Sequence, residues 1–347
     1  MLHALNMNTV SAIIYNVALL FIMMIPGIIL KKCNMISDGF GKGLSNLVLY
    51  IAQPALIFMA YLKSFSKEIL INSLYVLVLS IVAHVIFAAV SALVFKKAPD
   101  SRARMLKFAT IFSNAAFMGI PLIAAVLEDT YPGATLYASI YNITFNLFLW
   151  SLGVAICTKG RDVNNDGVDD YREVSRIDKN ENDDEKVKDG SGSILKALIH
   201  PVTLAAAIGL VFFILPIEGY VPAMVTDVLG MLKGLVAPLS MTVIGIRLAD
   251  MNLRGMFNDI YMYVFLALRH VLLPLAVVGI IKLCGVCGLE IPYVVSMVVV
   301  ILAAAPAASS ATMFAEKFNC DALYVSRLVT VSTIISIVTM PLIILLV

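Results

Sequence analysis

The sequence predicts an all-α integral membrane protein with ten transmembrane helices, arranged as two inverted repeats of five helices each. Three observations predict this fold: the composition, the number of long apolar segments, and a pattern of prolines and histidines that recurs in both halves. Of the 347 residues, 61% are hydrophobic and only 14% are charged, and the mean hydropathy is +0.94. Soluble proteins have about 45–50% apolar and about 25% charged residues, so this composition excludes a water-exposed globular protein.

The few charged residues are concentrated in one segment. Residues 158–193 contain 11 of the 23 acidic and 7 of the 25 basic residues. The remainder of the chain is therefore too poor in charge to form a polar surface. We divide the chain into a first five-helix repeat (1–157), a polar insert (158–193) and a second, inverted five-helix repeat (194–347).

Ten apolar segments are long enough to cross a bilayer, which takes about 20 helical residues. Charged or Gly/Pro-rich breaks separate them. The first segment lacks the basic start and the small-residue cleavage site of a signal peptide, so we interpret it as a span. The predicted spans are 9–30, 44–62, 70–95, 105–127, 134–157, 195–216, 222–249, 258–282, 292–315 and 323–347.

The distribution of Lys and Arg predicts the orientation. About twenty of these residues lie in or beside the connections that follow odd-numbered spans, and three lie in or beside the other connections and termini. Basic residues are enriched in cytoplasmic connections. We therefore expect a multi-pass protein of the cell membrane, with residues 158–193 in the cytoplasm and both termini on the extracytoplasmic side.

The two halves share matched positions. Their prolines are 67 and 68 residues apart, at Pro54 and Pro121 in the first half and at Pro238 and Pro306 in the second. The segment "HVIFAAVSALVFK" from His84 matches "HVLLPLAVVGIIK" from His270. Because five spans is an odd number, the second half must be inverted relative to the first. Inverted repeats with interrupted helices are the construction of many secondary transporters.

The fourth and ninth spans, "FATIFSNAAFMGIPLIAAVLE" and "VVVILAAAPAASSATMFAEKF", are interrupted by Gly, Pro and small polar residues. A broken backbone at membrane depth must be buried in protein or line a wet cavity. If both helices break, with Pro121 and Pro306 holding the breaks, two half-helix N-termini face one cavity, which suits a carboxylate. The alternative is a pair of proline kinks with small residues for close packing. The candidate site residues in these spans are Asn114, Gly119, Pro121, Pro306, Ser309 and Ser310.

The fifth span adds Asn142 and Asn146, which lie four residues apart on one helical face. Amides are costly in a lipid-facing position, so both should point into the bundle. They either line the substrate pathway or only form hydrogen bonds between helices. Their inverted counterparts in the tenth span are Ser332, Thr333 and Ser336.

Four ionisable residues lie deep within spans: Lys233, Arg269, His84 and His270. A cation could lie beside an anion's route, and a histidine could carry a coupling proton. We expect the simpler roles instead. Lys233 and Arg269 would then extend to the membrane interface, and the two histidines would form structural hydrogen bonds.

The polar insert contains a calcium-loop pattern. "DVNNDGVDDYRE" (162–173) fits D-x-[DN]-x-[DN]-G-x₅-E. Acidic linkers are often merely solvated, and Asp169 stands where such loops usually have an apolar residue, so both interpretations stay open. The tentative Ca²⁺ ligands are the side chains of Asp162, Asn164, Asp166, Asp170 and Glu173 and the carbonyl of Val168.

The chain has no motif of a metalloprotease, a serine hydrolase or a phosphate-binding loop. It also has no basic stripe for nucleic acid. We therefore expect neither an enzyme nor a nucleic-acid partner, and no required cofactor.

Several segments resemble one known family. They are "NAAFMGIPL" (114–122), "AAAPAASSATMFAEKFN" (303–319), "STIISIVTMPLIILL" (332–346), "QPALIF" (53–58) and "APLSMTVIGIRLA" (237–249). Together they resemble the auxin efflux carrier family, which includes plant PIN-type auxin carriers and bacterial malate and malonate permeases.

The resemblance implies a fold similar to that of bile-acid sodium symporters. In that fold, spans one, two, six and seven form a scaffold, the other six form a mobile transport unit, and broken spans four and nine cross at the substrate. Asn114, Gly119 and Pro121 match the fourth-span crossover, and Pro306 matches the ninth. Many bacterial relatives have Asn where this chain has Ser310. The plant members suggest a homodimer.

These observations together favour a secondary transporter, a permease or efflux carrier, for a small organic anion. We expect a mono- or dicarboxylate moved by alternating access, with Na⁺ or H⁺ left open as the coupling ion. One alternative is a sodium-coupled carrier of a larger amphipathic anion. Another is a membrane receptor or regulator with the insert as a calcium-responsive loop.

Overall fold

The computed structural model describes residues 7–37, 39–63, 66–158, 201–215, 220–249, 259–318 and 320–347. Within these residues the chain is helical, and its single β-type pairing is an antiparallel bridge between Ser113 and Ala307. The predicted calcium ligands in 162–173 lie outside the described residues, as does the insert from residue 159 on.

The α-helices are α1 (Met7–Ile22), α2 (Ile25–Lys32), α3 (Phe40–Leu47), α4 (Gln53–Tyr61), α5 (Lys67–Val94), α6 (Asp100–Ile111), α7 (Ile120–Val126), α8 (Ala134–Phe148), α9 (Val154–Thr158), α11 (Pro201–Ile214), α12 (Ala223–Gly234), α13 (Val236–Ala249), α14 (Ile260–Ala267), α15 (Leu273–Val286), α16 (Tyr293–Ala304), α17 (Ser310–Lys317) and α18 (Ala322–Ile344). Four π-helical turns continue or join them: η1 (Val48–Ala52), η3 (Ala115–Gly119), η4 (Leu149–Gly153) and η7 (Leu268–Leu272). A 3₁₀ turn, η2 (Phe95–Lys97), follows α5.

Seven helical stretches in the described residues are long and apolar enough to cross a membrane, and three shorter apolar helices accompany them, at Ala115–Val126, Pro201–Ile214 and Tyr293–Ala304. The outer face of α5 shows what these helices present to their surroundings. Leu74, Val78, Ile81 and Val85 recur along it at helical spacing and are 41–58% exposed. Such a stripe suits lipid rather than water. The chain is therefore a multi-pass helical membrane protein, as the composition predicts.

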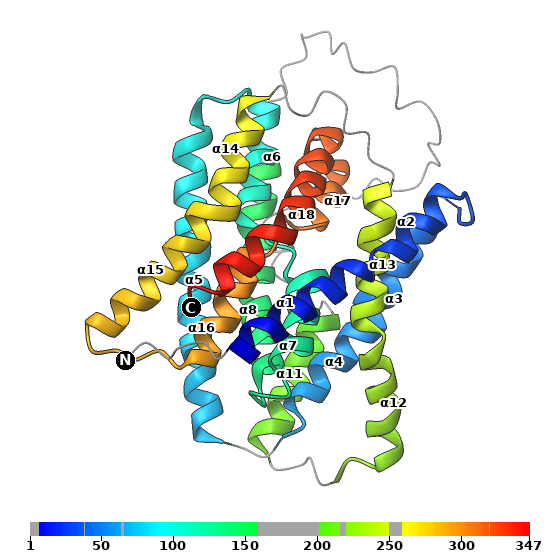
Figure 1. Ribbon diagram of the computed structural model, residues 1–347, viewed down its shortest axis with the longest axis vertical. Helices are drawn as coiled ribbons and strands as arrows, with labels where there is room; N and C mark the ends of the chain where they lie inside the picture. Colours follow the sequence, from blue (N-terminus) through cyan, green and yellow to red (C-terminus); the bar gives the residue numbers. More distant parts are fainter. Residues whose placement is uncertain are drawn as a thin grey trace.

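One group of helices, which we call the first group, consists of α1–α4 and α11–α13. Within it, α2 packs closely on α13, and α4 packs on α11 and α12 (Figure 1). The contact of α2 with α13 is reciprocal, because a Cβ on Gly27 would overlap the backbone of Thr242, and one on Gly245 would overlap the backbone of Met24. Only glycine allows two helix backbones to approach this closely.

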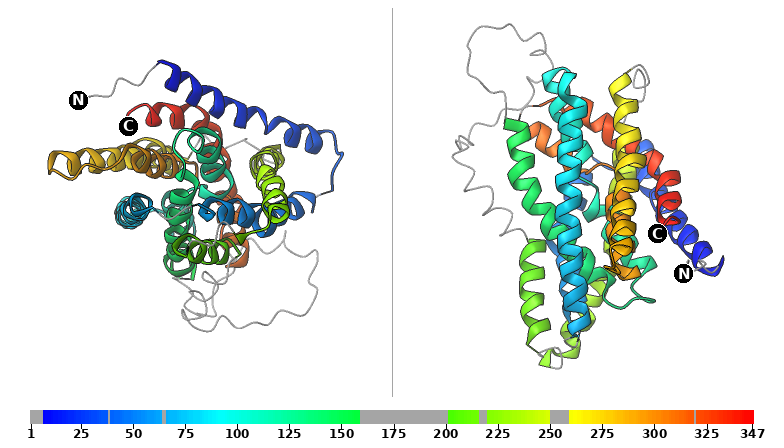
Figure 2. Two further views of the ribbon diagram at one scale, coloured as in Figure 1. Left: turned by 90° about the horizontal axis from the view of Figure 1, so that it is seen from below. Right: turned by 90° about the vertical axis from the view of Figure 1, so that its left-hand side faces the viewer.

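The second group consists of α5–α9 and α14–α18. Its longest helix, α5, packs against α6, α8 and α16, while α17 and α18 pack on each other. Figure 2 shows α5 and the α14–α15 pair on the side of the molecule opposite α12 and α13. Helix α1 belongs to the first group in the chain but also lies across α7 and α18 of the second (Figure 1).

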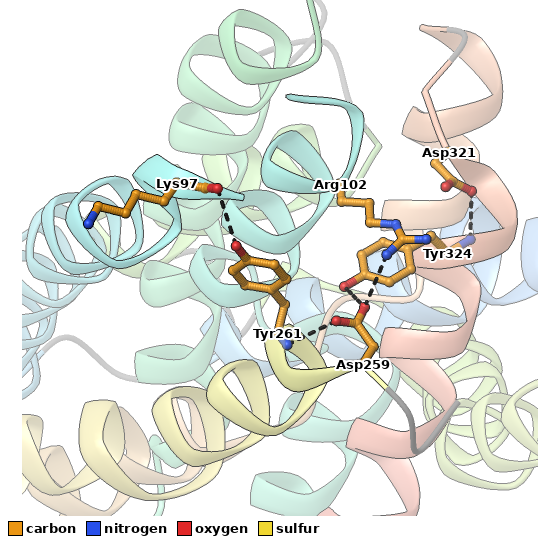
Figure 3. A network of polar contacts seen from close by, with 6 residues as sticks. All are labelled: Lys97, Arg102, Asp259, Tyr261, Asp321 and Tyr324. Atoms are coloured by element: carbon orange, nitrogen blue, oxygen red, sulfur yellow. Dashed lines mark hydrogen bonds and ion pairs between the residues drawn. The ribbon is translucent and has the colours of Figure 1, made fainter. Parts of the chain in front are cut away.

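A polar network holds together the ends of three helices of the second group (Figure 3). The Asp259 carboxylate accepts hydrogen bonds from the Tyr261 N–H (3.0 Å) and the Tyr324 hydroxyl (2.8 Å). The guanidinium of Arg102 lies 3.8 Å from the same carboxylate and 5.3 Å from the centre of the Tyr324 ring. This network joins the starts of α6, α14 and α18. Nearby, the Tyr261 hydroxyl donates to the carbonyl of Lys97, and Asp321 caps α18 (Figure 3).

An ion pair connects the two groups at the opposite end of the molecule. Lys63, just after α4, pairs with Glu128, which lies between α7 and α8. Glu128 also accepts hydrogen bonds from the N–H groups of Gly133 (3.2 Å) and Thr135 (2.8 Å) at the start of α8. Burial raises the pKa of the Glu128 carboxyl, but the bonds from Lys63 and Thr135 outweigh it, so that the pKa lies below its ordinary value.

The reciprocal glycine contact gives a first prediction. Replacing glycine by alanine inside a helix normally stabilises it by about 1 kcal/mol. Gly230→Ala in α12, which has open space around it, should follow this rule. Gly27→Ala should instead destabilise the protein by about 1–3 kcal/mol, because the methyl group overpacks the contact with α13. Thermal unfolding of the purified proteins in detergent would compare the two. Equal melting temperatures for both variants would contradict the close contact.

Candidate functional site at the crossing of two broken helices

Two helical segments are interrupted in the middle of the molecule. Helix α6 ends at Ile111 and helical structure resumes at Ala115, while α16 ends at Ala304 and α17 begins at Ser310. The extended stretches between them run antiparallel. The Asn114 N–H donates to the Pro306 carbonyl (2.7 Å), and the Ala308 N–H donates to the Phe112 carbonyl (2.9 Å). Each break thus supplies hydrogen-bond partners for the other, which satisfies buried backbone groups that lipid cannot.

The structure corrects the expected role of Pro121. Pro306 lies within its break, but Pro121 lies in the first turn of α7, seven residues after Asn114. The π turn η3 (Ala115–Gly119) runs directly into α7, so the helix continues through Pro121, which has no N–H to donate within it. Pro121 therefore does not hold the break, which lies at Phe112–Asn114. Gly119 has a packing role, since a Cβ there would overlap the side chain of Leu302 in α16.

A cavity lies beside the crossing. Its volume is about 90 Å³. Of the predicted residues, Asn114, Asn142, Asn146, Ser309 and Ser310 line it, whereas Gly119, Pro121 and Pro306 do not. Two further polar residues of the wall, Gln53 and Ser113, were not among the predicted site residues. The remaining lining residues are Leu49, Ala116, Phe117, Phe145, Leu149, Trp150, Val202, Ala308, Met313 and Phe314.

Three amides in the cavity wall have a polar atom without a partner in the described part of the chain. These atoms are Nδ2 of Asn114, Oδ1 of Asn142 and Oε1 of Gln53. Gln53 comes from α4 in the first group, and its Nε2 donates to the Ala116 carbonyl of η3 in the second. A buried polar group without a partner costs about 1–3 kcal/mol. A bound solute or water that paired with these groups would remove that cost.

Two arginines donate to backbone carbonyls around the crossing. Arg247 of α13 donates to the Ser309 carbonyl (2.9 Å). Arg269 of η7 donates to the carbonyls of Thr110 (3.1 Å) and Ala305 (2.6 Å) and is fully buried. The expectation that Arg269 extends to the membrane interface is therefore wrong. Its depth could have indicated this, because it lies eleven or more residues from either end of the predicted span 258–282, about 16 Å along a helix axis.

The two histidines form structural hydrogen bonds, as expected. His84 Nδ1 lies 2.7 Å from the Ser80 carbonyl, and its ring stacks on Phe148. His270 Nε2 lies 2.8 Å from the Ser332 hydroxyl, and this hydroxyl accepts a hydrogen bond from the Ala307 N–H at the crossing (2.8 Å). Ser332, one of the predicted counterparts of the fifth-span amides, therefore supports the ninth-span break.

Two broken helices that cross within a multi-pass helical bundle, beside a cavity with several amide and hydroxyl side chains, are typical of transport proteins. The comparison with known families agrees. The chain belongs to the membrane transport protein family, the auxin efflux carrier-like family indicated by its sequence motifs, with residues 12–344 matched. It is a membrane transporter rather than an enzyme.

Two archaeal relatives match nearly the whole chain. An uncharacterized transporter of Methanocaldococcus jannaschii is 21% identical over 333 residues, which cover 94% of this chain and 96% of the relative. An uncharacterized transporter of Methanothermobacter thermautotrophicus is 25% identical over 327 residues, covering 92% and 94%.

The cavity predicts a difference in thiol reactivity. In a variant whose five native cysteines are replaced, Ser310→Cys should react with a water-soluble thiol reagent at least ten times faster than Ser80→Cys. Ser310 lines the cavity, whereas Ser80 is fully buried and bonded to Thr144. Mass spectrometry of timed samples in detergent would measure both rates. Similar rates at the two positions would show that the cavity does not admit small polar molecules.

Proposed function

We propose that this transporter carries a small organic anion, a mono- or dicarboxylate, across the cell membrane by alternating access, with the crossing as its substrate site. The observation that carries the proposal is the electrostatic character of the cavity beside the crossing. Two helix N-termini face it, and its described lining contains no Asp or Glu.

The helix ends favour a negative charge. The helix formed by η3 and α7 begins at Ala115, and α17 begins at Ser310, both at the cavity. The first N–H groups of a helix have no partner within it, and the N-terminus carries about half a positive charge. Carboxylates and phosphates bind at such ends. The unpaired Nδ2 group of Asn114 adds a side-chain donor at the same place.

The rest of the wall favours a small and partly apolar substrate. Phe117, Phe145, Trp150 and Phe314 line the cavity, and the rings of Trp150 and Phe314 lie 5.2 Å apart between centres. One water molecule needs about 10–15 Å³ of such a cavity. The volume of about 90 Å³ therefore holds several waters or one small solute. An organic carboxylate would place its charge at the helix ends and its carbon chain against the aromatic rings.

The proposed architecture consists of ten spans in two inverted repeats, with the first helix group as scaffold and the second as mobile unit. The seven long and three shorter apolar helices support this count. The lysines at the ends of α2 and α5 and in the last turn of α17 lie toward the same end of the molecule, the upper end in Figure 1. We assign this end to the cytoplasm and both termini to the opposite side.

The same assignment implies which conformation of the alternating-access cycle the structure represents. Leu49, Trp150 and Phe314 line the cavity and lie on the cytoplasmic side of the crossing along their helices. The cavity would then open inward. On the other side, the Lys63–Glu128 pair joins the two groups, and this pair would have to separate when the mobile unit moves outward.

Uptake measurements would test the proposed substrate class. Purified protein in proteoliposomes should take up small labelled mono- or dicarboxylates but not amines of the same size. Asn114→Ala should raise KM for the best carboxylate by about 10- to 150-fold, because a hydrogen bond to a charged group contributes about 1.5–3 kcal/mol. Asn72→Ala is the matched control, since this buried amide bonds to Tyr137 away from the cavity. Uptake of amines in preference to carboxylates would refute the proposal.

Labelling of intact cells would test the proposed orientation. Tyr220 and Met35 are both exposed, at 84% and 67%, and lie in connections assigned to opposite sides. In a cysteine-free background, Tyr220→Cys should react with an impermeant thiol reagent added outside, and Met35→Cys should react only after the cells are opened. The reverse pattern would invert the assignment of the cytoplasmic end.

A further inference from the structure

Arg269 occupies an unusual position in the crossing, and the inference drawn from it rests on the function proposed above. The residue lies in η7, between α14 and α15, and its side chain is fully buried. Its two terminal nitrogens donate in different directions, Nη1 to the Thr110 carbonyl and Nη2 to the Ala305 carbonyl. One guanidinium therefore contacts both broken helices.

The two carbonyls occupy equivalent places. Thr110 is in the last turn of α6, and Ala305 is the C-terminal cap of α16. The last carbonyls of a helix lack partners within it, and a helix C-terminus carries about half a negative charge. In a continuous helix the Thr110 carbonyl would accept from the Asn114 N–H, but that group donates to Pro306. Two negative helix ends therefore converge on one cation.

No carboxylate shares this cation in the part of the chain that the structure describes, since none lies within 4 Å of its nitrogens. Its further neighbour is the ring of Phe87, whose centre lies 5.6 Å from the guanidinium carbon. An arginine side chain stays protonated in proteins, and an uncompensated buried charge is costly. The carbonyl dipoles of the two broken helices are thus the groups that stabilise it.

We propose that Arg269 is the built-in cation of the transport site and that it determines the preference of the site for anions. By binding both helix C-termini, it cancels their negative ends and leaves the positive N-termini of η3 and α17 unopposed at the cavity. Carbonyls freed by broken helices are also the groups that bind Na⁺ in other carriers. In this chain the Arg269 guanidinium donates hydrogen bonds to the corresponding carbonyls, those of Thr110 and Ala305. The crossing therefore needs no metal cation to stabilise them. Arg269 is a positioning residue, because it does not line the cavity.

Three variants test the role of the charge. Arg269→Gln removes it, Arg269→Lys keeps it without the planar fork that reaches two carbonyls, and Lys282→Gln removes an exposed cation from α15 as a control. In proteoliposomes, Arg269→Gln should raise the KM of a dicarboxylate at least three times more than that of a monocarboxylate of similar size. Arg269→Lys should restore most of the loss, and Lys282→Gln should behave as the wild type. A merely structural role would weaken uptake of both substrates equally, and that result would overturn the proposal.

A second measurement needs neither a substrate nor a variant. At constant ionic strength, replacing choline by Na⁺ should leave the melting temperature of the wild-type protein unchanged, because a ligand stabilises a protein only when it binds the folded state. A sodium-specific rise in melting temperature would overturn the proposal even if the Gln variant did not fold. If the wild type transported no carboxylate, the proposed function would fail, and the melting measurement would still show whether the folded protein binds Na⁺.

Discussion

The rest of the structure depends on the antiparallel pairing of backbone between residues 112–114 and 306–308. Within a membrane, each N–H or carbonyl without a partner costs several kcal/mol, so one broken helix alone would be expensive. Here two breaks satisfy each other through the bonds Asn114 to Pro306 and Ala308 to Phe112. Side chains satisfy the neighbouring groups: the Ser332 hydroxyl accepts from the Ala307 N–H, and Arg269 donates to Thr110 and Ala305.

This pairing also separates charge. The crossing brings together two helix C-termini and two helix N-termini, whose partial charges would largely cancel if all four ends were equally exposed. They are not, because Arg269 binds the two C-terminal carbonyls while the N-termini reach the cavity. The asymmetry arises from a single long side chain on a third element, η7. It is the basis of the anion preference that we propose for a cavity lined only by neutral side chains.

The sequence indicated much of the site because polar residues within membrane spans are expensive and therefore informative. Asn114, Asn142, Asn146, Ser309 and Ser310 were predicted on this basis, and they line one cavity. The same argument applies to Gln53, a polar residue within the predicted second span, so the sequence contained the signal for this residue as well. The prediction that Pro121 holds the fourth-span break was wrong, because the break lies at Phe112–Asn114. The helix begins at Ala115 and continues through the π turn η3 and Pro121, and the sequence alone does not distinguish a proline within a helix from one at a break.

The sequence by itself determined that this is a multi-pass helical membrane transporter, because apolar runs, charge asymmetry and family motifs are properties of consecutive residues. Only the tertiary structure decided which buried polar groups have partners. Ser113 and Ala307 are far apart in the chain but form one bridge, and Arg269 finds its partners on two other helices. Hydrogen bonding and the cancellation of helix dipoles depend on distances of about 3 Å between atoms. These distances are set by the packing of the whole bundle and cannot be derived from the order of residues along one helix.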